Sequence, residues 1–189
     1  MKRKFLSILL TLAMALTLLL TAAMAEVEKV AKVGENGYAT LAEAVAAAKN
    51  GDTVTLLKNV TLNTPAPTFA DKGDFALGID KSITIDGTND SGNYTITTNQ
   101  QRGIGVYTDD AANPLNVTFK NLNVVQTNQR SCIETRGGIK TLTLDGVKLD
   151  ATAASGNPQP LTIGGNQSNA AEVKIVNSTL SVTVKANGV

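Results

Sequence analysis

The acidic side chains best placed to do chemistry lie together at one point of the sequence. Asp109 and Asp110 are the only two acidic residues that are adjacent in the chain. Paired carboxylates can act as acid and base in cleaving a glycosidic bond, or they can hold a cation. The surrounding Asp-Asp-Ala-Ala-Asn-Pro sequence favours a simpler interpretation, a solvated turn. We therefore assign no catalytic residue and name Asp109 and Asp110 as the acidic candidates.

A second group of charged residues comes from positions that recur along the chain. Two Gln-Arg dipeptides, ending at Arg102 and Arg130, lie 28 residues apart, and Glu134 and Arg136 follow the second. Two arginines stacked side by side repel unless an anion or a carboxylate bridges them. Together with Asp109, these ligand-binding candidates predict an ion-pair patch or part of a site for an acidic sugar. A surface salt-bridge ladder is the favoured interpretation.

The composition excludes much other chemistry. The 189 residues include no His, so a His general base, a Ser-His-Asp triad and a His-ligated metal are impossible. The single Cys, Cys132, excludes an internal disulfide and a Cys-rich zinc site, and we expect it to be a buried core thiol. Aromatic residues make up 4% and the formal net charge is +1, so no nucleic-acid partner is indicated. No metal and no cofactor are predicted.

The elements that must position these residues follow an export signal. Residues 2–4 are basic, residues 5–20 form an apolar run, and residues 23–25 are the Ala-Met-Ala of a cleavage site. The short apolar run favours cleavage after Ala25 over a retained membrane anchor. Removing three basic residues from 17 leaves 14, against 16 acidic residues. The sequence thus predicts a signal peptide at 1–25 and a secreted or cell-surface mature domain at 26–189, without a membrane span.

One short helix is expected before a series of strands. Thr40 and Glu43 have the spacing of a capping box, in which each side chain bonds the other residue's backbone amide. Asn50-Gly51 supplies a left-handed exit, so the helical cap is predicted at about 40–49. Its apolar face is expected to cover the open end of the first coil. The residues of that face are Leu41, Ala44, Val45 and Ala48.

The chain from about residue 52 repeats one pattern. An apolar-polar-apolar triplet is followed by a bend at Gly or Asn, then by a second short run and, in four units, a third. Units of 25–34 residues with three short strands, repeated about five times, predict a parallel β-helix. An antiparallel β-sandwich does not explain the constant order. The triplets begin at Val54, Ile83, Val117, Leu142 and Val173, and the third runs begin at Leu77, Ile104, Cys132 and Leu161.

Stacking these coils about 4.8 Å apart would pair every strand with its counterparts in the neighbouring coils. The last coil has no cap like that of the first. Either the sequence is a fragment of a longer solenoid, which we favour, or a partner copy covers the last coil. The predicted inward stacks are Val54, Ile83, Val117, Leu142 and Val173, and beside them Leu56, Ile85, Phe119, Leu144 and Ile175.

The opening of this repeat is similar to that of a known group. Residues 37–49 (Gly-Tyr-Ala-Thr-Leu-Ala-Glu-Ala-Val and onward), 51–57 (Gly-Asp-Thr-Val-Thr-Leu-Leu) and 83–87 (Ile-Thr-Ile-Asp-Gly) resemble secreted bacterial right-handed β-helix proteins of the pectate-lyase-like superfamily. The resemblance implies the right-handed fold from about Gly37 onward. It does not imply one activity, because this fold hosts lyases, hydrolases, adhesins and passive stalks.

We expect an exported, non-catalytic β-helix scaffold that serves as an adhesion or glycan-interaction module. Its expected partner is a polysaccharide or a glycan on a host or cell surface. The alternative is the N-terminal part of a polysaccharide lyase or glycoside hydrolase that acts on uronate-type polymers. Only this alternative, through the resemblance, would bring in Ca²⁺.

Overall fold

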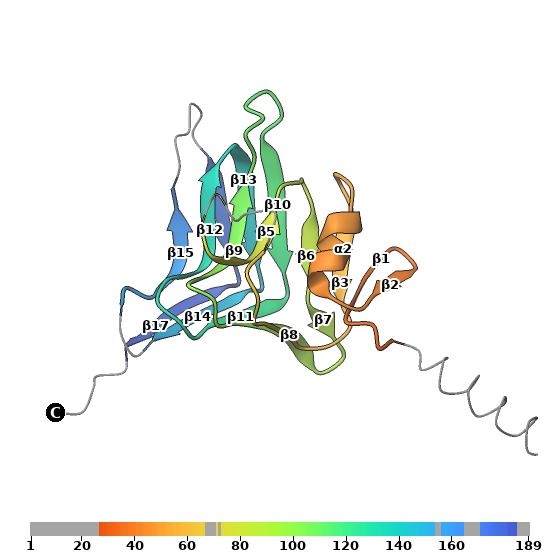
Figure 1. The fold of residues 1–189 in the computed structure, drawn as a ribbon, viewed down its shortest axis with the longest axis horizontal. Helices are drawn as coiled ribbons and strands as arrows, with labels where there is room; N and C mark the ends of the chain where they lie inside the picture. Colours follow the sequence, from red (N-terminus) through yellow and green to blue (C-terminus); the bar gives the residue numbers. More distant parts are fainter. Residues whose placement is uncertain (1–26, 67–70, 72, 154–155, 165–170, 185–189) are drawn as a thin grey trace, which may run out of the picture.

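The computed structural model describes residues 27–66, 71, 73–153, 156–164 and 171–184. The predicted signal peptide lies outside the described residues. The described part forms three sheets and a single helix, α2 (Leu41–Ala47) (Figure 1). In spatial order, sheet A contains β16 (Glu172–Val176), β13 (Ile139–Asp145), β10 (Leu115–Lys120), β6 (Thr84–Asp86), β3 (Thr53–Leu56), β1 (Ala31–Val33) and β2 (Asn36–Tyr38).

The other two sheets continue the same winding. Sheet B contains β17 (Thr179–Val184), β14 (Lys148–Ala153), β11 (Leu122–Gln126), β8 (Gly92–Thr98) and β4 (Val60–Leu62), and the short β7 (Thr88–Asn89) pairs with β8. Sheet C contains β15 (Gln159–Ile163), β12 (Ser131–Gly137), β9 (Arg102–Tyr107) and β5 (Phe75–Ile79).

The chain passes from sheet A to sheet B to sheet C in every turn, and equivalent strands of successive turns pair in parallel. This arrangement is a parallel β-solenoid of about four turns, which confirms the predicted fold class. The described residues give four complete coils and two strands of a fifth, against the predicted count of about five. No helix in this part of the chain is long and apolar enough to cross a membrane.

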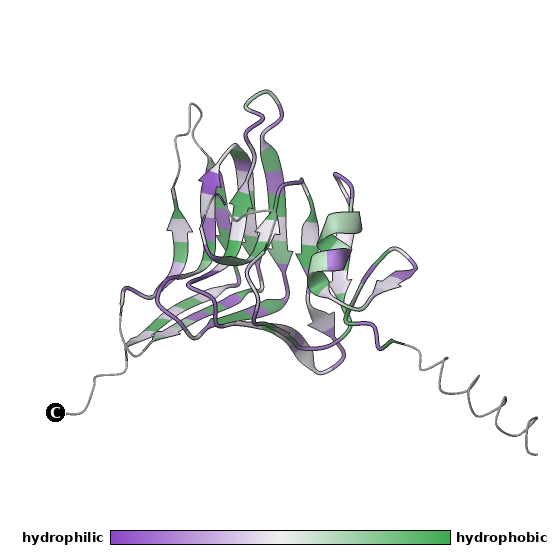
Figure 2. Cartoon of the chain, viewed as in Figure 1, coloured by the Kyte–Doolittle hydropathy of each residue, from purple (hydrophilic) through white to green (hydrophobic). Residues whose placement is uncertain are grey.

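The bore is filled by the inward residues of the triplets, and hydrophobic and polar positions alternate along the strands (Figure 2). From the second coil to the fifth, the predicted stack of Ile85, Phe119, Leu144 and Ile175 is confirmed by the strand registers. The first coil is an exception, because Val54 pairs with Ile85 and not with Ile83. A shift of two residues keeps every side chain on its own face, so the alternating pattern does not detect it.

The bend after the first triplet strand is left-handed in three coils. Asn121 has a φ of 46°, Asn177 of 50° and Gly146 of 65°. The bends after the first two triplets differ, since Lys58, Asn59 and Gly87 have no positive φ, and Gly87 is needed for another reason. A Cβ atom at Gly87 would lie 2.7 Å from the backbone oxygen of Asn121, so only glycine allows the two coils to approach.

We expect Asn121→Ala to lower the free energy of unfolding by about 1–2 kcal/mol, because alanine tolerates the left-handed region poorly. The substitution also removes a 2.8 Å hydrogen bond from Asn121 Nδ2 to Thr88 Oγ1. Urea denaturation measures the loss. Asn121→Gly is the matched control, since it removes the same bond but permits the backbone angle. Equal losses in the two variants would contradict the conformational explanation.

The cap at the N-terminal end is larger than the sequence predicts. The capping box is confirmed, with Thr40 N 3.0 Å from Glu43 Oε2 and Glu43 N 3.1 Å from Thr40 Oγ1. The helix ends at Ala47, before the predicted Asn50-Gly51 exit, because Ala48 is already extended. The predicted apolar face is buried. Lys81, in the connection from β5 to β6, donates hydrogen bonds from Nζ to the last helical carbonyls, at 2.6 Å to Ala46 and 3.1 Å to Val45.

A hairpin that the sequence analysis did not predict completes the cap. Strands β1 and β2 pair antiparallel, joined by Gly34 and Glu35, and β1 also pairs antiparallel with β3. Gly34 has a φ of 56°, which suits the first position of a two-residue hairpin turn. The hairpin covers the sheet A edge of the first coil and α2 lies beside it (Figure 1), whereas β4 and β5 remain the end strands of sheets B and C.

Candidate functional site

A polar cleft of about 990 Å³ lies at the corner where the chain passes from sheet C to sheet A. Three successive connections build it: β5 to β6, β9 to β10, and β12 to β13. Equivalent connections of a solenoid lie above one another at the strand spacing, so polar loop residues from separate coils form one surface. The residues that give the cleft its chemistry are Asp80, Tyr107, Asp109, Asp110, Arg136 and Lys140.

The two adjacent carboxylates have different environments. Asp110 closes a turn: its Oδ1 accepts from the backbone amides of Ala112 (3.0 Å) and Asn113 (3.2 Å), and its Oδ2 accepts from Asn113 Nδ2 (2.8 Å). The side-chain bond from Asn113, and then the amide of Ala112, lower the pKa of Asp110. Asp110 therefore acts as a turn residue at the rim. Asp109 lines the cleft beside it.

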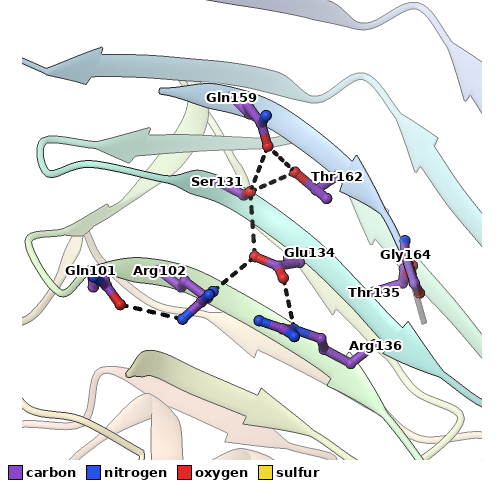
Figure 3. Close-up of polar contacts among 9 residues, drawn as sticks. All are labelled: Gln101, Arg102, Ser131, Glu134, Thr135, Arg136, Gln159, Thr162 and Gly164. Carbon is purple, nitrogen blue, oxygen red and sulfur yellow. Dashed lines mark hydrogen bonds and ion pairs between the residues drawn. The ribbon is translucent and has the colours of Figure 1, made fainter. Parts of the chain in front are cut away.

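The charged candidates of sheet C form a compact cluster around Glu134 (Figure 3). Glu134 Oε2 lies 3.2 Å from Arg102 Nε, and Oε1 lies 2.7 Å from Arg136 Nε. The side chains of Glu134 and Arg102 are only 10% and 12% exposed. One carboxylate therefore separates two arginines, which is the bridging that two neighbouring guanidinium groups require.

Hydroxyl and amide groups extend the cluster on the other side of Glu134. Ser131 Oγ donates to Glu134 Oε2 at 3.4 Å and lies 2.6 Å from Thr162 Oγ1, which in turn lies 2.5 Å from Gln159 Oε1 (Figure 3). Gln101 Oε1 accepts from Arg102 at 3.3 Å. These bonds come from three successive coils and fix the orientation of the carboxylate.

A single aromatic ring supports both arginines. The guanidinium carbons of Arg102 and Arg136 each lie 5.7 Å from the centre of the Phe75 ring, within the range of a cation–π contact. Phe75 is fully buried, but it packs with Ala66 outside the main core. A Cβ at Gly105 would lie 2.8 Å from Phe75 Cδ1, so the glycine makes room for the ring.

The predicted alignment of Arg130 with Arg102 differs from the structure by one residue. The register of β9 and β12 pairs Ile104 with Ile133, so Ser131 lies beside Arg102. The third run of this coil therefore begins its pattern at Ile133 and not at Cys132, and a one-residue shift reverses the face of each side chain. Arg130 instead lines a separate hollow of about 360 Å³, together with Gln129, Gln159 and Thr162.

Charge and burial act together on this cluster. Burial lowers the pKa of Arg102, the positive charges of Arg136 and Arg130 lower it further, and Glu134 opposes them. Within the cluster itself, the two positive charges of Arg102 and Arg136 share the single negative charge of Glu134. Cys132 is buried, and burial raises its thiol pKa to about 12. A thiol with that pKa is protonated at neutral pH and is a poor nucleophile.

Asp80, Tyr107 and Lys140 are cleft residues that were not predicted from the sequence. Asp80 directly follows β5, Tyr107 is the last residue of β9 and Lys140 is the second residue of β13, so alignment of the repeats on the third strands would have brought them to one corner. Among the residues that the structure describes, no group of three or more acidic or Cys side chains is arranged to hold a metal ion.

The fold and the cleft define the chain as a parallel β-solenoid protein with a polar groove along one corner. Comparison with protein-family models found no match, and neither did comparison with curated proteins or with solved structures.

Proposed function

We propose that this chain is an exported, non-catalytic β-solenoid module that binds a polysaccharide through the corner cleft, as a secreted or cell-surface protein. The observation that carries the proposal is the cleft itself, in which side chains from consecutive coils gather in one open hollow. The resemblance of the chain's opening to the pectate-lyase-like superfamily supports the same class of partner. The export part of the proposal rests on residues 1–25.

The chemistry of the cleft fits a sugar polymer. Its volume of about 990 Å³ is at the upper end of the usual range for ligand sites, and it is open at the surface. Aspartate accepts hydrogen bonds from sugar hydroxyls, and lysine and arginine donate to them. Tyr107 supplies the aromatic surface on which a sugar ring can stack.

The cleft mixes charges of both signs, because Arg136 and Lys140 line it together with Asp80, Asp109 and Asp110. The two basic residues could contact the acidic group of a charged sugar, and the aspartates its hydroxyl groups. The planar guanidinium of Arg136 can engage a carboxylate through two nitrogens. A uronate-type polymer would present such a carboxylate on successive residues.

Affinity electrophoresis of the mature chain in gels containing soluble uronate polymers tests the proposal. Wild-type protein is expected to be retarded, and Lys140→Gln to bind about two- to fivefold more weakly, the range of an exposed ion pair. Lys148→Gln is the matched control, since Lys148 is also exposed but lies on sheet B. Equal mobility of wild type in gels with and without polymer contradicts glycan binding, and equal weakening by the two substitutions contradicts this site.

A lyase or hydrolase is a second candidate, because Asp109 and Asp110 share the cleft with Arg136 and Lys140. A carboxylate and a cation close to one sugar could assist bond cleavage. Release of unsaturated or reducing sugars from uronate polymers, with and without Ca²⁺, would show activity and contradict the non-catalytic proposal. Asp109→Asn and Asp110→Asn then test the acidic pair, and unchanged activity in both would dismiss it.

A further inference from the structure

The C-terminal end of the solenoid exposes more large apolar side chains than the N-terminal end. Most of the large apolar side chains that are exposed in the described residues belong to the last three strands, β15, β16 and β17. Apart from Val176, whose counterpart in the coil below is the outward Asp145, their counterparts in the inner coils are buried. The exposed set is Ile163, Ile175, Val176, Leu180 and Val182.

The same three strands carry open edges. β15, β16 and β17 are the end strands of sheets C, A and B. Each pairs with the coil below on one side and with no described strand on the other. Open edges next to an exposed apolar core favour the addition of further strands.

We propose that this end binds a second copy of the chain, tail to tail, about a two-fold axis that runs beside the open edge of β16, perpendicular to sheet A. The three strands are consecutive in the winding, so β15 lies a third of a coil below β16 and β17 a third above. A two-fold rotation at β16 therefore sets each β16 against its copy and each β17 against the β15 of the other copy. All three edges gain an antiparallel partner at one strand spacing.

The charges on β16 select the register of this contact. Val173 and Ile175 point inward, because they pair with the buried Leu142 and Leu144, whereas Glu172 and Lys174 point outward. Residues that lie directly opposite each other in an antiparallel pair point to the same face of the sheet. The two-fold axis must therefore lie level with one residue of β16, and not between two residues. With the axis at Val173, each Glu172 faces the Lys174 of the other copy.

The neighbouring registers lack this complementarity. An axis at Lys174 places the two lysines opposite each other, which is unfavourable, and an axis at Ile175 places Lys174 opposite Val176. Glu172 and Lys174 already form a 3.4 Å ion pair within one chain. The two-fold contact at Val173 extends this pair into a cluster of four alternating charges.

The opposite end of the solenoid cannot accept the same surface. There the hairpin extends sheet A two strands beyond the first coil, while sheets B and C end at β4 and β5, so a head-to-tail contact could not pair all three sheets at once. An isologous contact uses one surface twice and closes. We therefore expect a dimer and not a filament.

Sedimentation velocity of the mature chain tests the proposal. Wild type is expected to be a dimer in the micromolar range. Glu172→Lys and Lys174→Glu should each raise the dissociation constant about tenfold, since each turns two attractive pairs into repulsive ones. The double variant restores opposite charges and should recover the wild-type constant. Circular dichroism confirms folding of the variants, whose changed side chains are exposed.

A cross-link tests the register independently. Val173→Cys places two thiols across the proposed axis, where antiparallel strands bring Cα atoms within disulfide range. Oxidation is expected to give a covalent dimer of Val173→Cys, but not of Lys174→Cys. Cys132 is buried and does not interfere. A monomeric wild type, a double charge variant that fails to dimerise, or preferential cross-linking through residue 174 would each overturn the proposal.

Discussion

Glu134→Ala is expected to lower the free energy of unfolding by about 3 kcal/mol, because it leaves Arg102 and Arg136 without their shared counter-ion. The two guanidinium groups would then face each other above Phe75, at a site where Arg102 is only 12% exposed. Burial already lowers the pKa of Arg102, and Glu134 is the group that opposes this effect. For a chain of this size the midpoint of thermal unfolding should fall by about 6–12 °C.

Two variants make this prediction specific. Glu134→Gln keeps the length and the acceptor oxygen, so any loss it shares with Glu134→Ala reports the charge and not the packing. Glu28→Ala removes a carboxylate from the exposed ion pair with Lys58, where the Glu28 side chain is 78% exposed, and should change stability by less than about 1 kcal/mol. Guanidinium chloride denaturation measures all three. Similar effects at Glu134 and Glu28 would show that the cluster has no special role.

Phe119→Ala is expected to cost about 3–5 kcal/mol of stability through the cavity it leaves in the bore. Phe119 is fully buried in β10, between Ile85 of the coil below and Leu144 of the coil above. Each coil contacts only its neighbours, so the loss of one filled position weakens the stacking on both of its sides.

The outward neighbour in the same strand is the control. Thr118→Ala changes a half-buried residue on the solvent face, and we expect a loss of less than about 1 kcal/mol. Differential scanning calorimetry of both variants measures the contrast. A loss at Phe119 as small as that at Thr118 would mean that the bore relaxes around the gap, and would contradict tight packing between coils.

The core positions of this fold could be predicted from sequence because they depend on local alternation. Inward residues such as Val117 and Phe119 recur at intervals that a parallel stack requires, and the structure buries them. The capping box at Thr40 is also local. The pairing partners are not local: Val54 pairs with Ile85 after a two-residue shift, and no pattern within either strand records that shift.

The site could be predicted only in part for the same reason. The sequence indicated that Arg102, Glu134 and Arg136 would lie close together, and they do. It misplaced Arg130, because the irregular third run of that coil hides the true register. The contact of Phe75 with the arginines could not be predicted, because it depends on the space that Gly105 leaves for the ring in the neighbouring strand.

The hairpin β1–β2 lies at the first end of the stack of coils, and it is also the first part of the solenoid to be synthesised. It precedes every coil in the chain, and its pairing with β3 connects residues no more than about 25 positions apart. During synthesis this end is complete first, and it offers the next strand an edge with a fixed register. Each finished coil then presents three strand edges on which its successor can pair.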